Sequence, residues 1–490
     1  MAEAGRNGGT PDNTVMASEF AIAQSWTSDR RGPVRWLWSH TLRHKLQILG
    51  VLFGAFSNAA LAALAPVLVG QAFDAVSATP ADLGTLGRAA ALIAGSQVLR
   101  GGLQLVRNFS AEVIGQRMER DTRDELYSSL IGKSMSFHDL QPTGEVMARA
   151  TNDVREVNFM FNPGLNLVIG SANFLFMPLF VAPAIAPQLL AAPLVYLVAY
   201  VISVRAYLRQ LNPAAQQVRD EFGKMNAVLA EAIEGIETVK AAAQEKREGN
   251  RFLRAVTGWR DAYVQQRDIE AFYIPLLLLG LVQAGGLLHS LLLFSTEQIA
   301  LGDVVAYNGV LLLFGFPTFA AQWAYSRVAT GVASARRILE LINAETLLDQ
   351  NLEGYKGAMK GTVELQDVSF CYRPPGIACP SEPALEGITF QAAPGQTIAV
   401  VGQTGSGKST IAKLINRTYD VDTGAVIVDG VNVRDWNLEA LRQQISIIEQ
   451  DIFLFSRTVA ENIAFGHPDA SRAEIEEAAR AAQAHDFIVN

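Results

Sequence analysis

Cysteine is almost absent from this chain of 490 residues: only Cys371 and Cys379 occur. The segment around them reads as cytoplasmic, where thiols stay reduced, and this argues against a disulfide. No histidine lies near the pair, so a metal site is expected even less. We therefore predict two reduced thiols.

Charge is also scarce. Only 18% of the residues are charged, against a usual share of about 25%. The net charge of -8 argues against a general nucleic-acid binder, so we predict no nucleic-acid partner. Half of the residues are hydrophobic, which points to a membrane protein.

The first 30 residues lack the apolar core of a signal peptide. They are polar and rich in Gly, Ser and Asn, and they predict a disordered cytoplasmic tail. The next segment, Arg30–Lys45, mixes basic residues with Trp36 and Trp38. This mixture is typical of a helix at the membrane interface or of a charged flank to a membrane span.

Six apolar runs are long enough to cross a bilayer, which takes about 20 residues. They predict an all-α transmembrane domain. The predicted spans are residues 46–71, 86–106, 165–184, 187–204, 271–293 and 304–323.

Basic residues gather on one side of these spans. The short loops after spans one, three and five hold only Arg88 as a basic residue, whereas the long segments between the other spans hold many. The long segments and the N-terminus are therefore predicted to be cytoplasmic, at a bacterial inner or plasma membrane. Both long segments read as helical extensions of the spans. Each has a break near its middle, at Gln141–Gly144 and at Glu234–Glu237.

Arg100 lies inside the second predicted span. A charge at membrane depth is costly and often marks function, so Arg100 could line a cavity. The alternative is that its side chain reaches the cytoplasmic face, because Arg107 is only two helical turns further on. We favour the second interpretation and leave the first one open.

A phosphate-binding pattern follows the last span. Gly361–Val368 predicts a strand by its alternating pattern, Gly395–Val401 predicts a short strand, and Ile411–Arg417 predicts a helix. Between the short strand and the helix lies a glycine-rich loop, in the order strand, loop and helix that phosphate binding requires. The predicted phosphate-binding residues are Gly402, Gln403, Thr404, Gly405, Ser406, Gly407, Lys408, Ser409 and Thr410.

The chemistry of the loop explains these residue types. Gly405 and Gly407 let backbone N–H groups turn toward an anion. Lys408 reaches the β- and γ-phosphates, and the Ser409 hydroxyl can ligate Mg²⁺. A guanine-reading Asn-Lys-x-Asp element is absent from the sequence, which favours ATP. Tyr372 could supply an adenine-stacking platform, or it could be an ordinary core aromatic of a strand.

These features together resemble ATP-binding cassette (ABC) exporters of the fused type. The resemblance covers nearly all of residues 30–490. Its specific motifs are Pro142–Arg149, Asn152-Asp153, Glu234–Lys240, the Tyr372 segment, the phosphate loop, Gln450 in Ile447–Asp451, and Thr458–Asn462.

The resemblance implies roles for single residues. Tyr372 would stack on adenine, Lys408 would hold the phosphates, Ser409 would ligate Mg²⁺, and Gln450 would contact Mg²⁺ and the attacking water. Segments Asp139–Met147 and Glu221–Gly235 would be the two coupling helices. The apolar strand predicted at Ile445–Glu449 would precede the glutamine of this family, rather than being the carboxylate strand that binds Mg²⁺.

The resemblance also implies the domain plan. It predicts a tail at 1–30, a transmembrane domain at 31–345, a linker at 346–360 and an α/β P-loop nucleotide-binding domain at 361–490. The signature motif Leu-Ser-Gly-Gly-Gln and the catalytic glutamate of the family do not occur by Asn490. We therefore expect this domain to be incomplete, with apolar sheet edges exposed, and we name no general base.

The implied function is ATP-driven export by a pair of half-transporter subunits, as a homodimer or a heterodimer in membrane lipid. The alternative is a regulatory half that binds ATP without hydrolysing it. The spans consist mostly of Leu, Ala, Val, Gly and Phe. This composition suits a small hydrophobic or amphipathic substrate, but it equally suits any helix bundle in lipid.

Overall fold

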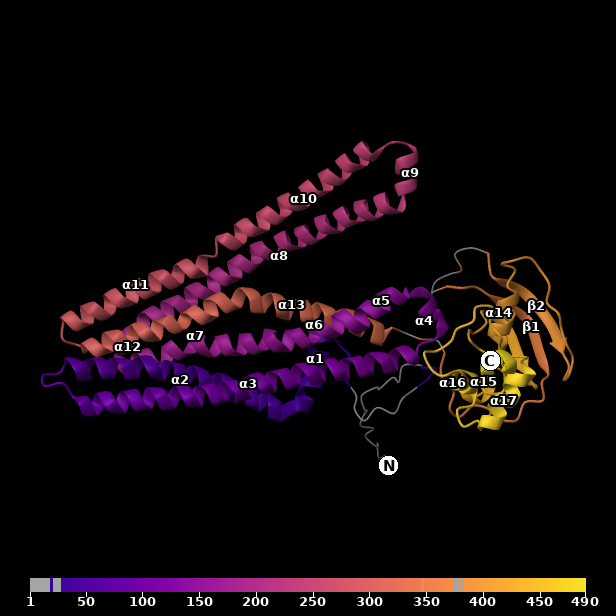
Figure 1. Cartoon of the computed structure of the whole chain (residues 1–490), viewed down its shortest axis with the longest axis horizontal. Coiled ribbons are helices and arrows are strands. Elements are labelled where there is room, and N and C mark those ends of the chain that lie inside the picture. The colour runs from indigo at the N-terminus through magenta and orange to yellow at the C-terminus, as the bar shows by residue number, and fades with distance from the viewer. Residues whose placement is uncertain (1–17, 21–27, 345, 347, 374–378, 380–381) are drawn as a thin grey trace, which may run out of the picture. The chain divides into compact units, whose positions relative to one another are not determined.

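The protein is described here by a computed structural model, which covers all residues except 1–17, 21–27, 345, 347, 374–378 and 380–381 (Figure 1). The chain divides into two compact units. We call residues 28–122 and 152–337 the membrane unit. We call residues 123–151 and 338–490, with the described residues before 28, the P-loop unit.

Within the described residues, six helices are long and apolar enough to cross a membrane. They run over Pro33–Ser77, Leu83–Ile131, Thr143–Ile185, Pro187–Glu234, Glu245–Ser295 and Leu301–Asn343. Each predicted span lies within one of them, so the all-α transmembrane architecture with long helical extensions is confirmed. The domain limits 31–345, 346–360 and 361–490 stay predictions.

Irregular turns divide these six helices into smaller elements, and two further short helices lie between them. In chain order they are α1 (Pro33–Thr41), η1 (Leu42–His44), α2 (Lys45–Ser77), α3 (Leu83–Ile131), α4 (Met135–Leu140), α5 (Thr143–Ala148), η2 (Arg149–Asp153), α6 (Val154–Phe159), η3 (Met160–Leu165), α7 (Asn166–Ile185), η4 (Pro187–Leu190), α8 (Ala191–Glu234), α9 (Ile236–Ala241), α10 (Glu245–Ala271), α11 (Ile274–Ser295), α12 (Leu301–Leu311), η5 (Leu312–Phe314) and α13 (Gly315–Asn343).

Helices α8 and α10 run side by side, with the short helix α9 at their far tip (Figure 1). The predicted break at Glu234–Glu237 is confirmed, because α8 ends at Glu234. The predicted coupling helix at Glu221–Gly235 is wrong as a separate element, since this segment continues α8. Good helix formers (Leu, Ala and Glu) occupy five of the six positions 229–234 and carry the helix on to Gly235. The short helix at the tip is α9.

The P-loop unit contains a sheet of four strands in the order β2-β1-β3-β4, antiparallel throughout. The strand predicted from Gly361 is confirmed as β1. The elements are β1 (Val363–Phe370), β2 (Leu385–Ala392), α14 (Lys408–Ile415), β3 (Thr423–Val428), β4 (Val431–Asn432), α15 (Leu438–Arg442), α16 (Val459–Ile463), η6 (Ala464–Gly466), α17 (Arg472–Ala481) and α18 (His485–Val489).

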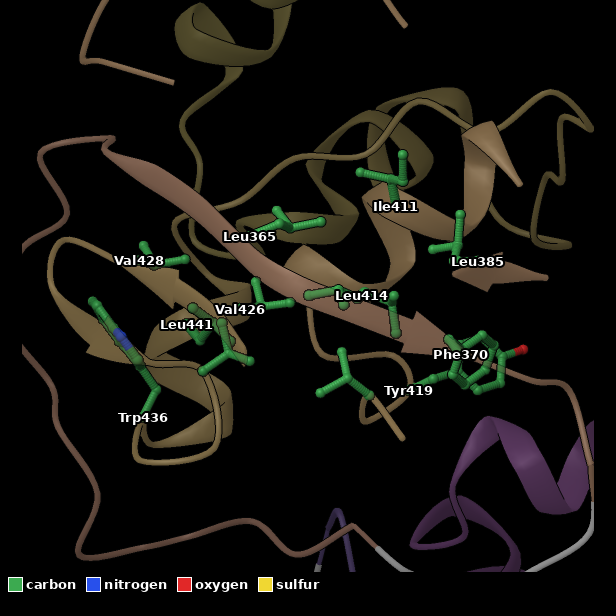
Figure 2. Close-up of a cluster of buried hydrophobic side chains, with 13 residues drawn as sticks. Leu365, Phe370, Leu385, Ile411, Leu414, Tyr419, Val426, Val428, Trp436 and Leu441 are labelled. Atoms are coloured by element: carbon green, nitrogen blue, oxygen red, sulfur yellow. The ribbon is translucent and has the colours of Figure 1, made fainter. Parts of the chain in front are cut away.

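The sheet and helix α14 share one hydrophobic core (Figure 2). Leu365 of β1 and Val426 of β3 are partners in register, and both are almost fully buried. Leu414 of α14 joins the same cluster. This packing holds the first turn of α14, and therefore the end of the glycine-rich loop, against the sheet.

Two predicted strands do not form. Residues 395–401 and 445–449 have no regular structure, and Val401 is 89% exposed and Ile448 98% exposed. A strand is stabilised by hydrogen bonds to a neighbouring strand, and no segment among the described residues pairs with either one.

The prediction of two reduced thiols is wrong in this structure, because Cys371 and Cys379 form a disulfide. Their Cα atoms are 6.0 Å apart, within the usual range for such a bond. Cys371 follows β1, and its backbone N–H donates to the Asp422 carboxylate at 2.8 Å. The prediction of reduced thiols rested on a reducing cytoplasmic compartment, and it did not consider how close the fold brings the two cysteines.

The predicted disordered tail lies largely outside the described residues, but residues 18–20 contradict it. The backbone N–H of Glu19 donates to the Gly132 carbonyl at 3.0 Å, and its carboxylate pairs with Arg442 at 2.7 Å. An ion pair and a backbone hydrogen bond therefore hold this short segment on the P-loop unit. Tail composition alone does not reveal such partners.

Candidate functional site: the glycine-rich loop

Two glycines shape the loop between β2 and α14. Gly405 has φ 87° and Gly407 has φ 84°, a left-handed conformation that side chains disfavour. Gly407 is also the N-cap of α14. The turn leaves the first N–H groups of the helix without partners inside the helix, and such a helix start attracts anions.

Close packing adds a second reason for glycine at position 407. A Cβ there would lie 2.5 Å from the Ala384 carbonyl oxygen and 2.6 Å from Leu385 Cδ2. Both contacts are too short to exist, so a side chain would push the loop away from β2. Gly402 is similarly constrained, because its Cβ would lie 2.7 Å from Ser406 Oγ.

The polar side chains of the loop are placed for phosphate. Lys408 Nζ folds over the loop and donates to the carbonyls of Gly402 at 3.0 Å and Gln403 at 2.6 Å. Ser409 is exposed, and among the described residues its hydroxyl has no hydrogen-bond partner. Thr410 is buried. A flexible ammonium and a free hydroxyl beside a ring of N–H groups fit a nucleotide phosphate with Mg²⁺.

Tyr372 stands beside this loop. Its hydroxyl and Thr410 Oγ1 are 3.1 Å apart, and its ring packs edge-on against Phe370 and Tyr419, with centroids 4.8 and 5.3 Å away. The side chain is 45% exposed, so it is not a core residue of a strand. One part of the ring surface is therefore available for stacking, while its neighbours fix its orientation.

Tyr419 connects this site to helix α4. Its hydroxyl donates to Asp139 of α4 at 2.6 Å, and its ring also packs on Phe370 (Figure 2). Burial raises the pKa of Tyr419, and the hydrogen bond to the Asp139 carboxylate raises it further. The phenol therefore stays protonated and donates. Sequence reasoning missed Tyr419, because its partners lie far away in the chain.

Gln450 lies in an exposed segment without regular structure, and its side chain has no hydrogen-bond partner among the described residues. In the part of the chain that the structure describes, no hydrogen bond therefore connects the Gln450 side chain to the glycine-rich loop. The nearby motif Thr458–Asn462 is structural. Thr458 and Glu461 form a capping box at the start of α16. Asn462 accepts a hydrogen bond from the Phe455 N–H at 2.9 Å.

Comparison with known proteins identifies the family. Residues 48–318 match the family described as ABC transporter transmembrane region, which is more than half of the chain, and residues 385–489 match the family described as ABC transporter. The chain belongs to the ABC transporter family. It therefore carries a membrane domain and a nucleotide-binding domain in one polypeptide.

Several ABC transporters are similar to the chain over most of its length. An uncharacterized ABC transporter ATP-binding protein of Bacillus subtilis, YknU, is 29% identical over 80% of this chain and 67% of its own length. An ATP-dependent lipid A-core flippase of Pseudomonas aeruginosa is 32% identical over 78% of this chain and 63% of its own length. The chain thus spans about two thirds of these relatives.

A solved structure supports the fold. The structure of a bacterial Atm1-family ABC exporter with ATP bound superposes with a TM-score of 0.70 and 26% identity, covering 92% of this chain and 78% of that one. The fused arrangement of six membrane helices and a nucleotide-binding domain is therefore confirmed for this ABC transporter.

Arg100 lines a cavity of about 780 Å³ in the membrane unit. It makes hydrogen bonds with Asn58 at 3.3 Å and with Gln97 at 3.2 Å. Of the two interpretations drawn from the sequence, the structure supports the cavity-lining one, which we did not favour.

Proposed function

We propose that this ABC transporter subunit uses ATP to export a hydrophobic or amphipathic substrate across a membrane. The observation that carries the proposal is a phosphate-binding loop of suitable geometry in a chain with six membrane-crossing helices. The relative named as a lipid A-core flippase supports an amphipathic substrate. We place the protein in a bacterial inner or plasma membrane, with the loop on the cytoplasmic side.

The residues of the loop divide the binding of ATP between them. The N–H groups from Gly405 to Lys408 surround the phosphates, and Lys408 exchanges its two carbonyl partners for phosphate oxygens. Tyr372 stacks on the adenine. When bound, Mg²⁺ would neutralise the charge that develops on the phosphates, and Ser409 and Gln450 are the residues that would hold it.

Two such subunits form the working transporter, as a homodimer or a heterodimer. ATP binds the closed arrangement of the two nucleotide-binding domains better than the open one, so it shifts the population toward closure. Helix α4, through Asp139 and Tyr419, and helix α9 are the elements that we propose carry this change to the membrane helices. The cavity then opens alternately to the two sides.

Glu461 does not fit the role of a general base in this scheme. Its carboxylate accepts hydrogen bonds from the Thr458 hydroxyl at 2.7 Å and the Thr458 N–H at 2.9 Å. The hydroxyl bond, with the backbone bond next, lowers the pKa of Glu461. A carboxylate occupied in this way is a weak base and is committed to capping α16.

The proposal is tested by transport in liposomes that contain the full-length subunit. ATP added on the loop side should drive net movement of a fluorescent amphiphile across the bilayer. Lys408→Ala should abolish the movement without changing the insertion of the protein. ATP binding with no ATP-dependent movement of any amphiphile in a panel would favour the regulatory, non-hydrolysing alternative instead.

A further inference from the structure

The cavity that contains Arg100 is polar and positively charged. Its polar lining consists of two arginines and six side-chain amides, and no acidic residue lines it. The arginines are Arg100 and Arg107, two turns apart on the same face of α3. The amides are Asn58, Gln97, Gln104, Asn108, Asn162 and Asn166.

Arg107 is built into the fold. It is 4% exposed, and it donates from Nε to Asn166 Oδ1 and from Nη2 to the Asn166 carbonyl, both at 2.7 Å. Two glycines make room for it. A Cβ at Gly54 would lie 2.7 Å from Arg107 Cβ, and a Cβ at Gly170 would lie 2.4 Å from Nη2.

The charges of this pair are not neutralised within the described residues. Arg100 and Arg107 bond only to amide and carbonyl oxygens, which are neutral. The nearest carboxylate in this hydrogen-bond network is that of Glu112, which accepts a hydrogen bond from Asn162 Nδ2 at 2.6 Å. Glu112 itself does not line the cavity. Two cations in a membrane-spanning region without a counter-ion are costly, and a bound anion would remove this cost.

The remaining lining is apolar. Leu167, Phe174 and Phe316 face the same cavity, and the two phenylalanine rings pack 5.4 Å apart. A ligand that fits both parts has an anionic group and an apolar body. The volume of about 780 Å³ falls within the usual range for small-molecule sites.

We propose that this cavity binds an amphipathic anion, whose phosphate or carboxylate group lies between Arg100 and Arg107 and whose apolar part lies against the phenylalanines. This inference rests on the proposed export function and narrows its substrate class. The amides supply further N–H donors to the anionic oxygens. Guanidinium groups suit this role because they present several N–H donors in a fixed geometry.

Binding to the protein in phosphatidylcholine nanodiscs tests the inference, without ATP. Octyl phosphate should bind at least about tenfold more tightly than octyl glucoside or octyltrimethylammonium, as charge-assisted hydrogen bonds predict. Arg100→Gln and Arg107→Gln should each weaken octyl phosphate binding by about tenfold and leave octyl glucoside unchanged. Arg88→Gln is the matched control, because it removes an exposed arginine from the same helix, and it should have no effect.

The outcomes separate the possible explanations. If Arg107→Gln does not fold, Arg100→Gln decides, because Arg100 is only half-buried. Equal affinity for the three octyl compounds, or no effect of Arg100→Gln, would overturn the anion site. Inorganic phosphate that binds as tightly as octyl phosphate would overturn the assignment to an amphiphile.

A nucleotide control separates this inference from the proposed function. Lys408→Ala should abolish binding of a fluorescent ATP analogue and leave octyl phosphate binding unchanged. Loss of anion selectivity with intact ATP-driven transport would contradict only the substrate class. Intact anion binding without ATP-driven transport would contradict only the export function.

Discussion

At the residue scale, the exposure of Tyr372 excludes the core alternative, and adenine stacking by this ring remains our proposal. Its neighbours Phe370, Tyr419 and Thr410 hold the ring while leaving it partly exposed. A stacking interaction between a base and an aromatic ring contributes about 1–3 kcal/mol.

Tyr372→Ala should therefore weaken ATP binding by roughly tenfold to a hundredfold, which corresponds to this energy. Tyr372→Phe is the matched control. It keeps the ring and loses only the contact with Thr410, so the affinity should stay within about threefold. Titration with a fluorescent ATP analogue gives both values. An alanine variant with wild-type affinity would remove Tyr372 from the site.

Asp429 provides a test that depends on pH. Its carboxylate accepts N–H bonds from Thr362 at 2.8 Å and Gly361 at 3.1 Å, and also from Lys360. Burial alone would raise the pKa of Asp429, but the N–H bonds from Lys360, Thr362 and Gly361 outweigh it, and the pKa is lowered. The ionised carboxylate therefore stabilises the fold above its ordinary pKa of about 4.

Asp429→Asn should lower the melting temperature at pH 7, because the amide is a weaker acceptor than the carboxylate. The difference from wild type should shrink as the pH falls below about 4 and through the lowered pKa of Asp429, where the wild-type group also becomes neutral. Thermal unfolding in detergent at a series of pH values measures this. A difference that is constant with pH would contradict the account.

At the element scale, sequence patterns predicted helices well and the nucleotide-binding sheet poorly. Membrane helices satisfy their hydrogen bonds internally, so apolar length was enough to find six of them. Strands depend on partners far away in the chain. The strand predicted as β1 forms because β2 and β3 pair with it. The strands expected at 395–401 and 445–449 have no pairing partner among the described residues, and they do not form. The contact between Asp139 and Tyr419 was missed for the same reason. The disulfide between Cys371 and Cys379 was missed although the two residues are close in the chain, because the prediction rested on the expected reducing compartment.

The disulfide can be tested directly. Alkylation of the purified protein under denaturing, non-reducing conditions should leave Cys371 and Cys379 unmodified, because both thiols are consumed by the bond. Prior reduction should make both alkylatable. Mass spectrometry of the peptides gives the answer. Full alkylation without reduction would restore the prediction of two free thiols made from the sequence.

Within the P-loop unit, a hydrogen bond joins Tyr419 to Asp139 of α4. Tyr419→Phe removes the bond to Asp139 and keeps the ring packing on Phe370 and Tyr372. We expect ATP affinity to stay near that of wild type, while ATP-driven transport falls severalfold because the link to the membrane helices is weakened. Asp139→Asn should have a smaller effect, because the amide oxygen still accepts the bond. Equal loss of ATP binding and transport would show that Tyr419 acts on the nucleotide site alone.

At the scale of the whole molecule, the sequence was sufficient for the family and the glycine-rich loop, because both depend on local patterns. It could not identify the charged cavity, since Asn58, Arg107 and Asn166 come from three different helices. We propose that the loop binds nucleotide and that the cavity binds an amphipathic anion. Their coupling is the central claim about this transporter subunit.

Hydrolysis of ATP by the full-length subunit in lipid tests this claim most directly. The account predicts a Mg²⁺-dependent rate of hydrolysis that rises when octyl phosphate is added. In Lys408→Ala the rate should be lower by at least about a hundredfold, because the variant lacks a cation positioned to stabilise the negative charge that develops on the phosphates. A rate that octyl phosphate leaves unchanged would contradict the coupling. A rate that is the same in wild type and Lys408→Ala, or no Mg²⁺-dependent hydrolysis at all, would contradict the whole account.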